Sequence, residues 1–281
     1  MELAGELAHR GLTQLDDATL ARLAQAGVTR LNINANSLQA LPEVLGGLTA
    51  LTELHAQRNL LTTVPETLGQ LEALQEVDLS HNELKALPRS LAWSQVLDVQ
   101  LHHNKLSELP AAVGRLTCVV ELSVQSNELT RLPDAIGGLA HLERLDLSEN
   151  QLTALPASMG RLASLRELIL SSNQLAALPP GIGQLPHLEE LSAKANRLAQ
   201  LPSLSGATAL THLQIPHNRL SMLPADLGRV STLLYIDASH NQLTELPDLS
   251  GLTALRELQL SSNILTTLPP SIGSLVSLVG C

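Results

Sequence analysis

The chain has 281 residues, of which 44% are hydrophobic, yet only 1% are aromatic and none is Phe. A globular core of this size normally uses aromatic side chains, whereas a stack of thin, similar layers can be filled by Leu alone. The formal net charge is -10 and no run of Lys or Arg occurs, so we expect no nucleic-acid partner. No apolar stretch has the length of a membrane span, and we expect no membrane insertion.

The first 27 residues differ from the rest of the chain. The segment LAHRGLTQL is similar to half of the repeat described below, with Arg10 in the place of a recurring Asn. The segment DDATLARLAQAG predicts a short helix with an Asp at its N-cap and a Gly at its C-terminal end. We therefore expect residues 1–27 to form an N-terminal half-repeat and capping helix. The beginning of the chain lacks the basic and apolar regions of a signal peptide.

Residues 28–277 contain an Asn that recurs 23 residues apart seven times and 22 residues apart three times. The eleven positions are Asn36, Asn59, Asn82, Asn104, Asn127, Asn150, Asn173, Asn196, Asn218, Asn241 and Asn263. The frame around each, L-x-x-L-x-L-x-x-N-x-L-x-x-L-P, resembles the leucine-rich repeat. This resemblance implies an α/β solenoid with a horseshoe shape, built from eleven repeats.

Residues 142–164 illustrate the expected layer. Leu145 and Leu147 alternate with polar residues, which predicts a short strand with Leu directed inward. Successive strands are expected to pair in parallel and to form a concave sheet of about eleven strands. We interpret Asn150, which follows the strand, as a buried residue whose amide satisfies backbone groups of its own repeat and of the next one.

The convex side of each repeat begins at the Leu-Pro pair. Four residues after the Pro stands a Gly in ten repeats, and Ala92 in the remaining one. The pattern predicts one helical or 3-10 turn per repeat, with the Gly supplying a positive φ. The 22-residue repeats lose one convex residue in RSLAWSQV, PSLSGATAL and PDLSGLTAL, so these should be flatter. We expect Trp93 to fill the space left in the first of them.

The end of the repeat array is also predicted to be irregular. Leu278 opens a twelfth repeat, and residues 278–281 are expected to be its truncated start. Because a solenoid needs a polar cap at each end, this predicts a fragment, a partner that covers the end, or a frayed last layer at Cys281.

The sheet surface is where the repeats are free to differ. Seven of the eleven first outward positions are acidic, which predicts a negative stripe and a partner with a basic or polar surface. The alternative is an ordinary solvated face. Ile169 and Tyr235 depart from the polar pattern of the outward positions, and exposed apolar or aromatic side chains are typical interface anchors. The predicted partner-binding residues are Leu97, Gln100, Val120, Glu121, Ser123, Arg144, Asp146, Glu167, Ile169, Glu190, His212 and Tyr235.

Histidines form two pairs at matching places in adjacent repeats, His81 with His103 and His217 with His240. Zinc prefers four ligands in a fixed tetrahedron, so two imidazoles on separate layers predict no metal site. Such clusters would instead make binding sensitive to pH near neutrality. We find no catalytic or nucleotide-binding motif, and we expect neither enzymatic activity nor a cofactor.

The segments LPEVLGGLTALTEL, LPDAIGGLAHLERLDLSENQLTALP and LPPGIGQLPHLEEL resemble the Ras-suppressor/Soc-2 group of intracellular leucine-rich-repeat proteins. The resemblance implies a cytoplasmic, non-enzymatic scaffold for protein–protein interaction in signalling, with the partner on the concave face. One alternative is the recognition domain of a larger signalling enzyme: a kinase, GTPase or ubiquitin ligase. Another is a structural subunit of a cytoskeletal or ciliary assembly.

Overall fold

The structure, a computed structural model, describes residues 5–279. It forms two compact units, residues 1–142 and 143–281, each of which is described by itself. Met1–Ala4 of the expected half-repeat, and Gly280 and Cys281 of the expected truncated repeat, lie outside the described residues. The division into residues 1–27, 28–277 and 278–281 stays a prediction.

Unit 1 begins with helix α1 (Asp17–Gln25), whose N-cap Asp16 accepts a hydrogen bond from the Thr19 amide at 2.7 Å. The helix expected after Asp16 is therefore present. Five three-residue strands follow: β1 (Arg30–Asn32), β2 (Glu53–His55), β3 (Glu76–Asp78), β4 (Asp98–Gln100) and β5 (Glu121–Ser123). The 3-10 helices of this unit are η1 (Glu43–Gly47), η2 (Glu66–Gln70), η3 (Ala111–Arg115) and η4 (Asp134–Gly138).

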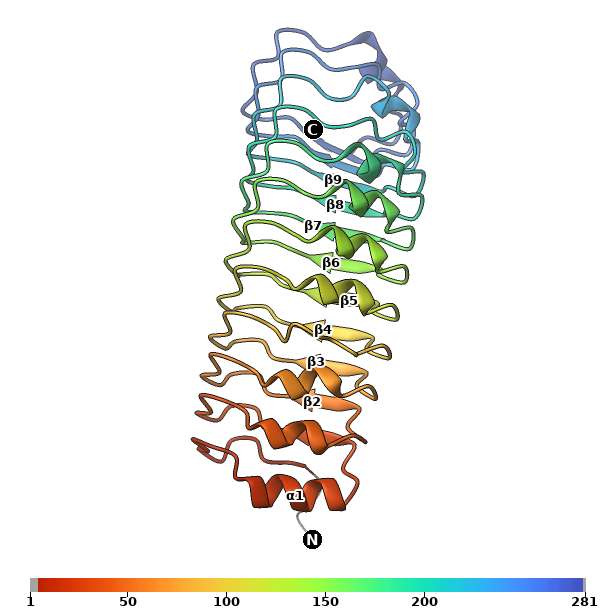
Figure 1. The fold of residues 1–281 in the computed structure, drawn as a ribbon. Helices are drawn as coiled ribbons and strands as arrows, with labels where there is room; N and C mark the ends of the chain where they lie inside the picture. The colour runs from red at the N-terminus through yellow and green to blue at the C-terminus, as the bar shows by residue number, and fades with distance from the viewer. Residues whose placement is uncertain (1–4, 280–281) are drawn as a thin grey trace. The chain divides into compact units, whose positions relative to one another are not determined.

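Unit 2 repeats the same arrangement. Its strands are β6 (Arg144–Asp146), β7 (Glu167–Ile169), β8 (Glu190–Ser192), β9 (His212–Gln214), β10 (Tyr235–Asp237) and β11 (Glu257–Gln259). Its 3-10 helices are η5 (Ala157–Arg161), η6 (Pro180–Gln184), η7 (Leu227–Arg229) and η8 (Pro270–Ser274). In residues 5–279 the eleven predicted strands are thus present, and the prediction of a parallel leucine-rich-repeat solenoid is confirmed (Figure 1).

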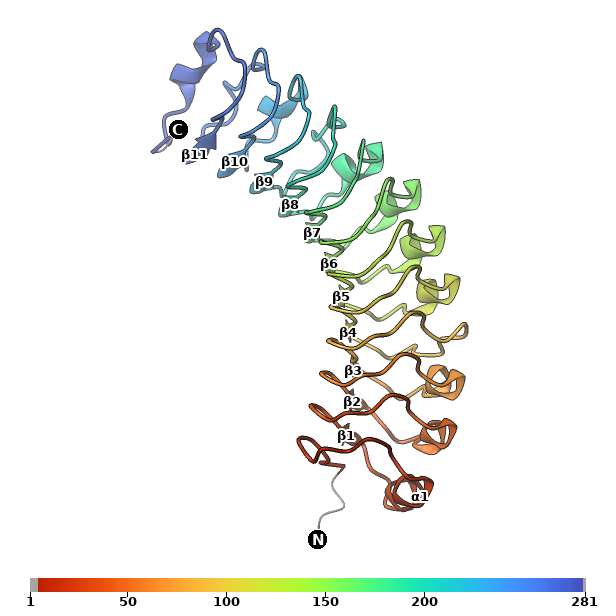
Figure 2. The ribbon, with the colours of Figure 1, turned by 90° about the vertical axis from the view of Figure 1, so that its left-hand side faces the viewer.

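Within each unit the strands pair in parallel and in order of sequence (Figure 2). The register places one inward residue of every strand beside its equivalent in the next layer. In unit 1 this row is Leu31, Leu54, Val77, Val99 and Leu122, and in unit 2 it is Leu145, Leu168, Leu191, Leu213, Ile236 and Leu258, all nearly inaccessible to solvent. The period-two pattern therefore predicts correctly which side chains fill the core.

The recurring Asn residues lie in the turn after each strand, and most of them are buried. Asn82 is representative. Its Nδ2 donates to the carbonyls of Leu79 in its own repeat and of Ala56 in the preceding repeat, both at 3.0 Å. Its Oδ1 accepts from the Leu61 amide, also of the preceding repeat, at 3.0 Å. The structural interpretation is confirmed, but the predicted direction is wrong, because Asn82 bonds to the layer before it rather than to the one after.

The residue immediately before each Asn adopts a left-handed backbone, which the repeat frame alone did not predict. In the eleven repeats its φ lies between 50° and 58°. Non-Gly residues enter this region at a cost, and His is among the types enriched there. The recurring His-Asn pairs, such as His81-Asn82 and His103-Asn104, are the sequence signal of this turn.

The turn side of each unit carries 3-10 helices in its 23-residue repeats, as expected. The three 22-residue repeats, which we expect to be flatter, carry none, so the prediction of one turn in every repeat is wrong for these three. In the first of these repeats Trp93 is fully buried, and its indole N–H donates to the Leu68 carbonyl at 2.9 Å. The predicted packing role of Trp93 is therefore confirmed. Its buried ring fills space in a repeat that is one residue shorter than the 23-residue repeats.

The Gly residues of the turn side serve a different purpose from the one predicted. The positive-φ glycines among the described residues are Gly5, Gly11 and Gly27, and none of these follows a Leu-Pro pair. At Gly183 an added Cβ would lie 1.8 Å from the Ser203 carbonyl oxygen of the next repeat. Close approach of adjacent layers, not backbone conformation, therefore requires a residue without a side chain.

We expect Gly183→Ala to lower the free energy of unfolding by about 1–3 kcal/mol, because the added methyl group forces two layers apart. Gly273→Ala is the matched control, since a Cβ there meets no atom within 4 Å. That change should be neutral or stabilise by up to about 1 kcal/mol. Urea unfolding followed by circular dichroism measures both. Equal losses for the two variants would contradict the close-approach explanation.

The last described residues continue the pairing pattern of the repeats. The Val279 amide donates to the Arg256 carbonyl at 2.8 Å, as the Arg256 amide does to the Leu234 carbonyl at 2.8 Å one repeat earlier. Residues 270–279 thus place the chain where a further strand would begin.

Candidate functional site

The candidate site is the outward surface of the sheet, which we call the sheet face. It comprises the first and third residue of each strand, the second residue after the strand and the residue just before the strand. The predicted residues divide between the two units. Unit 1 carries Leu97, Gln100, Val120, Glu121 and Ser123, and unit 2 carries Arg144, Asp146, Glu167, Ile169, Glu190, His212 and Tyr235.

Leu97 and Val120 lie side by side at the entry to β4 and β5. The Val120 amide donates to the Leu97 carbonyl at 2.8 Å, so the two residues occupy neighbouring layers. Leu97 is 47% exposed and Val120 is 37% exposed. They therefore form an apolar pair on a fixed backbone, whereas the matching Leu234 of unit 2 is only partly exposed.

The acidic stripe of unit 1 has partners within the sheet face. Arg30 binds both carboxylate oxygens of Glu53, at 2.5 and 2.9 Å, and this hydrogen bonding lowers the pKa of Glu53. His55 lies between two carboxylates, 3.3 Å from Glu76 and 3.7 Å from Glu53. Burial raises the pKa of Asp98, although a hydrogen bond from Gln100 at 2.7 Å opposes this. Arg30 therefore offsets the charge of one carboxylate of the stripe.

Gln100 also donates to Glu121 at 3.2 Å, so this predicted residue bridges two strands of the stripe. In unit 2 the same pattern recurs. Arg144 pairs with Glu167, and Gln214 donates to Glu190 at 3.1 Å. The acidic side chains are thereby held in defined positions.

Aspartates at the third strand position have a structural role that composition did not show. Asp146 accepts hydrogen bonds from the amide and hydroxyl of Ser148, at 2.9 and 2.6 Å. Asp78 and Asp237 hold Ser80 and Ser239 in the same way. A predicted binding residue, Asp146, is therefore also part of the turn that positions the following Asn.

His212 and Tyr235 occupy equivalent places on β9 and β10, with ring centroids 6.0 Å apart. Burial raises the pKa of Tyr235, and Asp237 and Glu257 add to the shift, so its hydroxyl stays protonated near neutrality. Ile169, the last residue of β7, is only partly exposed. These three residues give unit 2 a mixed aromatic and apolar surface.

The histidine pairs differ between the units. In unit 1, His81 and His103 stack with centroids 4.4 Å apart, and His102 meets both rings edge-on at 5.1 and 5.3 Å. In unit 2, His217 and His240 stack at 4.2 Å as a pair. Burial, followed by the neighbouring His103 and His102 and by Arg58, lowers the pKa of His81. Sequence reasoning matched His81 with His103 and missed that His102 joins them.

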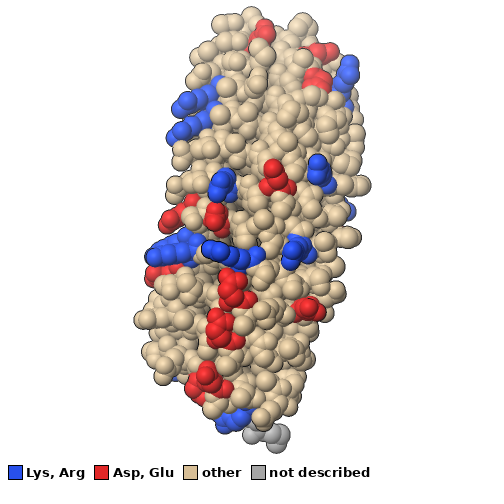
Figure 3. Space-filling view, viewed as in Figure 1, with Lys and Arg blue, Asp and Glu red and all other residues tan. Residues whose placement is uncertain are grey.

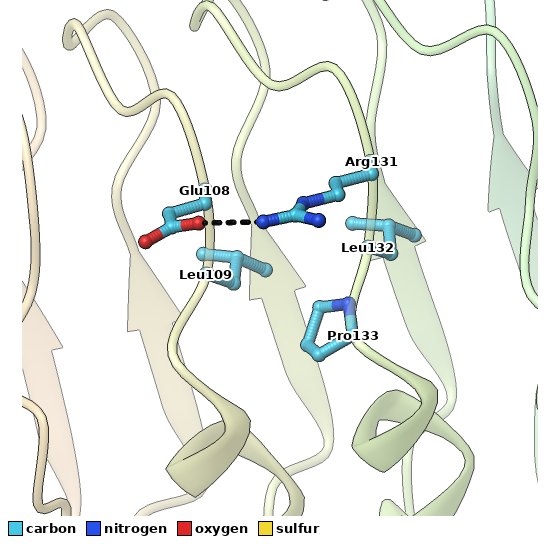
Figure 4. A pocket seen from close by; sticks show the side chains of 5 residues that line it. All are labelled: Glu108, Leu109, Arg131, Leu132 and Pro133. Carbon is cyan, nitrogen blue, oxygen red and sulfur yellow. Dashed lines mark hydrogen bonds and ion pairs between the residues drawn. The ribbon is translucent and has the colours of Figure 1, made fainter.

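Outside the sheet face, the surface carries a pocket that is open to solvent. A pocket of about 180 Å³ is lined by Glu108, Leu109, Arg131, Leu132 and Pro133 (Figure 4). Arg131 and Glu108 pair there at 3.3 Å, but their side chains are 79% and 63% exposed, so water is not excluded. In the view of Figure 1, basic and acidic side chains lie next to one another in several places, and uncharged surface surrounds these groups (Figure 3). No described helix is both long and apolar enough to cross a membrane.

Comparisons with known proteins agree with this architecture. The family described as leucine rich repeat matches residues 26–84, 119–175, 164–220 and 208–265. No curated protein matches the chain. A leucine-rich-repeat protein of Leptospira interrogans is similar, with 30% identity and a TM-score of 0.75 over 97% of this chain and 76% of that one.

Two further solved structures are similar. YopM from Yersinia enterocolitica shares 27% identity, with a TM-score of 0.65 over 98% of this chain and 59% of its own. The ectodomain of the Arabidopsis receptor kinase HAESA, in complex with an IDA peptide hormone, shares 29% identity, with a TM-score of 0.73. The match covers 90% of this chain but only 45% of the HAESA chain. Because the matched repeats span more than half of the sequence, the chain belongs to the leucine-rich-repeat family.

Proposed function

We propose that the protein is a non-enzymatic interaction module that binds a protein or peptide on its sheet face. The observation that carries this proposal is the exposed pair Leu97 and Val120, fixed side by side on hydrogen-bonded strands. Rigid apolar anchors surrounded by polar residues are the usual centre of a protein interface. Proteins of this fold commonly mediate protein–protein interaction, and HAESA binds a peptide hormone.

The contact surface of unit 1 is proposed to extend from the apolar pair to Gln100, Glu121 and Ser123. Glu121 and Gln100 are linked at 3.2 Å, so a partner would meet polar groups that are already ordered. Such ordering lowers the entropy cost of binding. The contact surface of unit 2 comprises Arg144, Asp146, Glu167, Ile169, Glu190, His212 and Tyr235, with Tyr235 as the aromatic anchor.

The partner is proposed to have a basic or polar surface. The carboxylates of Glu76 and Glu190 remain accessible on the sheet face although each has a neighbour on it. Acidic side chains on a binding face steer basic partners toward it, an effect that weakens as salt rises. Recovery of the partner should therefore fall when the salt concentration is raised.

The narrower family group, the scaffold role in signalling and the cytoplasmic location are also proposals. Membership of the Ras-suppressor/Soc-2 group rests on the L-P-x-x-[LI]-G-x-L frame, and a scaffold role in signalling follows from that resemblance. A cytoplasmic location is supported by the use of only two cysteines, of which Cys118 is not in a disulfide. The comparisons favour neither a signalling enzyme nor a structural subunit.

The test compares Leu97→Ser/Val120→Ser with Val44→Ser, a matched control on η1. Val44 is 44% exposed, and it lies on the turn side rather than on the sheet face. We expect the double variant to recover at least tenfold less partner from a lysate of the source cells, measured by quantitative mass spectrometry. Val44→Ser should recover the same proteins as the wild type.

Serine leaves the net charge unchanged, so the comparison isolates the apolar contact. Melting temperatures close to that of the wild type would show that all variants are folded. Undiminished recovery by the double variant, or a loss confined to Val44→Ser, would contradict the proposed binding face.

A further inference from the structure

Three histidines of unit 1, His81, His102 and His103, form a cluster that we call the histidine cluster. One ring nitrogen from each side chain lies within 4.8 Å of the other two. His81 and His103 are stacked with 21° between their planes, whereas His102 stands at 86° and 78° to them. Three imidazoles thus converge on one point from two adjacent layers.

The backbone fixes this arrangement. His81 and His103 occupy the left-handed positions before Asn82 and Asn104, at φ of 53° and 55°. The His81 amide donates to the His102 carbonyl at 2.9 Å, which locks the two layers together beneath the rings. The backbone that carries the three rings is therefore held by hydrogen bonds between adjacent layers and by the turns before Asn82 and Asn104.

We propose that the histidine cluster binds one divalent transition-metal ion of the class that prefers imidazole, with zinc as the reference ion. Such a metal takes imidazole nitrogens at about 2.0–2.1 Å, which in a tetrahedron places the nitrogens about 3.4 Å apart. Because the present separation is at most 4.8 Å, each pair needs to close by no more than about 1.4 Å. His81 and His103 are exposed, so small side-chain rotations bring this about.

The fourth coordination position would face an open pocket of about 320 Å³ beside the cluster, lined by His81 and His102 among others. Gln57 also lines it, and its buried Oε1 has no hydrogen-bond partner among the described residues. A metal-bound water there could donate to this oxygen, which accounts for a polar atom that the fold does not satisfy. Three protein ligands with an open position are typical of exchangeable rather than purely structural zinc sites.

Two other clusters of potential metal ligands differ from the histidine cluster. His217 and His240 stack in the same way in unit 2, but no group of three metal ligands found in residues 5–279 includes them. Glu53, His55 and Glu76 do form such a group, yet Arg30 already binds both oxygens of Glu53. The third imidazole therefore distinguishes the histidine cluster from the pair in unit 2.

The experiment is an isothermal titration of the tag-free full chain with zinc chloride. We expect one equivalent to bind, and at least a tenfold weaker affinity in His103→Asn and in His102→Gln. His240→Asn is the matched control, because His240 and His103 have the same left-handed backbone, which Asn tolerates. Its affinity should equal that of the wild type.

A second measurement needs no substitution. Zinc added to the wild-type protein should shift the imidazole NMR signals of His81, His102 and His103, and leave those of His217 and His240 unchanged. Zinc should also raise the melting temperature of the wild type and of His240→Asn, but not of His103→Asn. No saturable binding, or equal weakening by His103→Asn and His240→Asn, would overturn the proposal.

Discussion

Replacing Trp93 by Ala is expected to lower the free energy of unfolding by about 3–5 kcal/mol, the largest loss we predict for a single substitution. Trp93 is the only Trp of the chain, and its side chain has no exposed surface. Its removal leaves a cavity in a repeat that already lacks one residue, and the Leu68 carbonyl keeps only its bond from the Leu71 amide. Calorimetry or urea unfolding followed by circular dichroism measures the loss.

Trp93→Phe separates the contribution of core packing from that of the hydrogen bond to the Leu68 carbonyl. Phe fills most of the space but cannot donate to the Leu68 carbonyl, so we expect a loss of about 1–3 kcal/mol. Val44→Ala, at an exposed position of η1, should change stability by no more than about 0.5 kcal/mol. A Trp93→Ala loss as small as that of the surface control would show that the ring does not support the short repeat.

Asn82→Ala is the second substitution with a large expected effect, a loss of about 3 kcal/mol. A single buried group left unpaired costs about 1–3 kcal/mol, and this change affects more than one. The Leu61 amide loses its acceptor, and the carbonyls of Ala56 and Leu79 each lose one of the two Asn side chains that donate to them. Because these groups belong to two layers, the loss weakens the contact between repeats as well as the turn itself.

Asn263→Ala provides the comparison for this substitution. Asn263 makes equivalent bonds to Leu243, Ala238 and Leu260, but it is only partly buried. Water can replace its amide, so the expected loss is about 1 kcal/mol or less. Urea unfolding of both variants measures the difference. Equal losses, or no loss in Asn82→Ala, would contradict the buried-amide role.

Some contacts of the candidate site could be predicted from the sequence, and others could not. Strand register follows directly from the repeat period, so the adjacency of Leu97 and Val120 could be predicted. The pairing of Arg144 with Glu167 could not, because two long side chains in adjacent layers can extend toward or away from each other. The meeting of His102 with His81 and His103 was missed for a related reason. It depends on the left-handed backbone of the turn, which turns the rings of two different columns toward one point.

The sequence by itself determined the layered architecture, the inward Leu rows and the buried Asn ladder. These follow from a short pattern that repeats along the chain, and a repeated local pattern leaves one way to stack the layers. Only the tertiary structure decided that Asn82 binds the preceding layer, that Gly183 is required by the approach of Ser203, and that three imidazoles converge. Each of these depends on distances between atoms of neighbouring layers, and a residue pattern specifies the order of layers but not those distances.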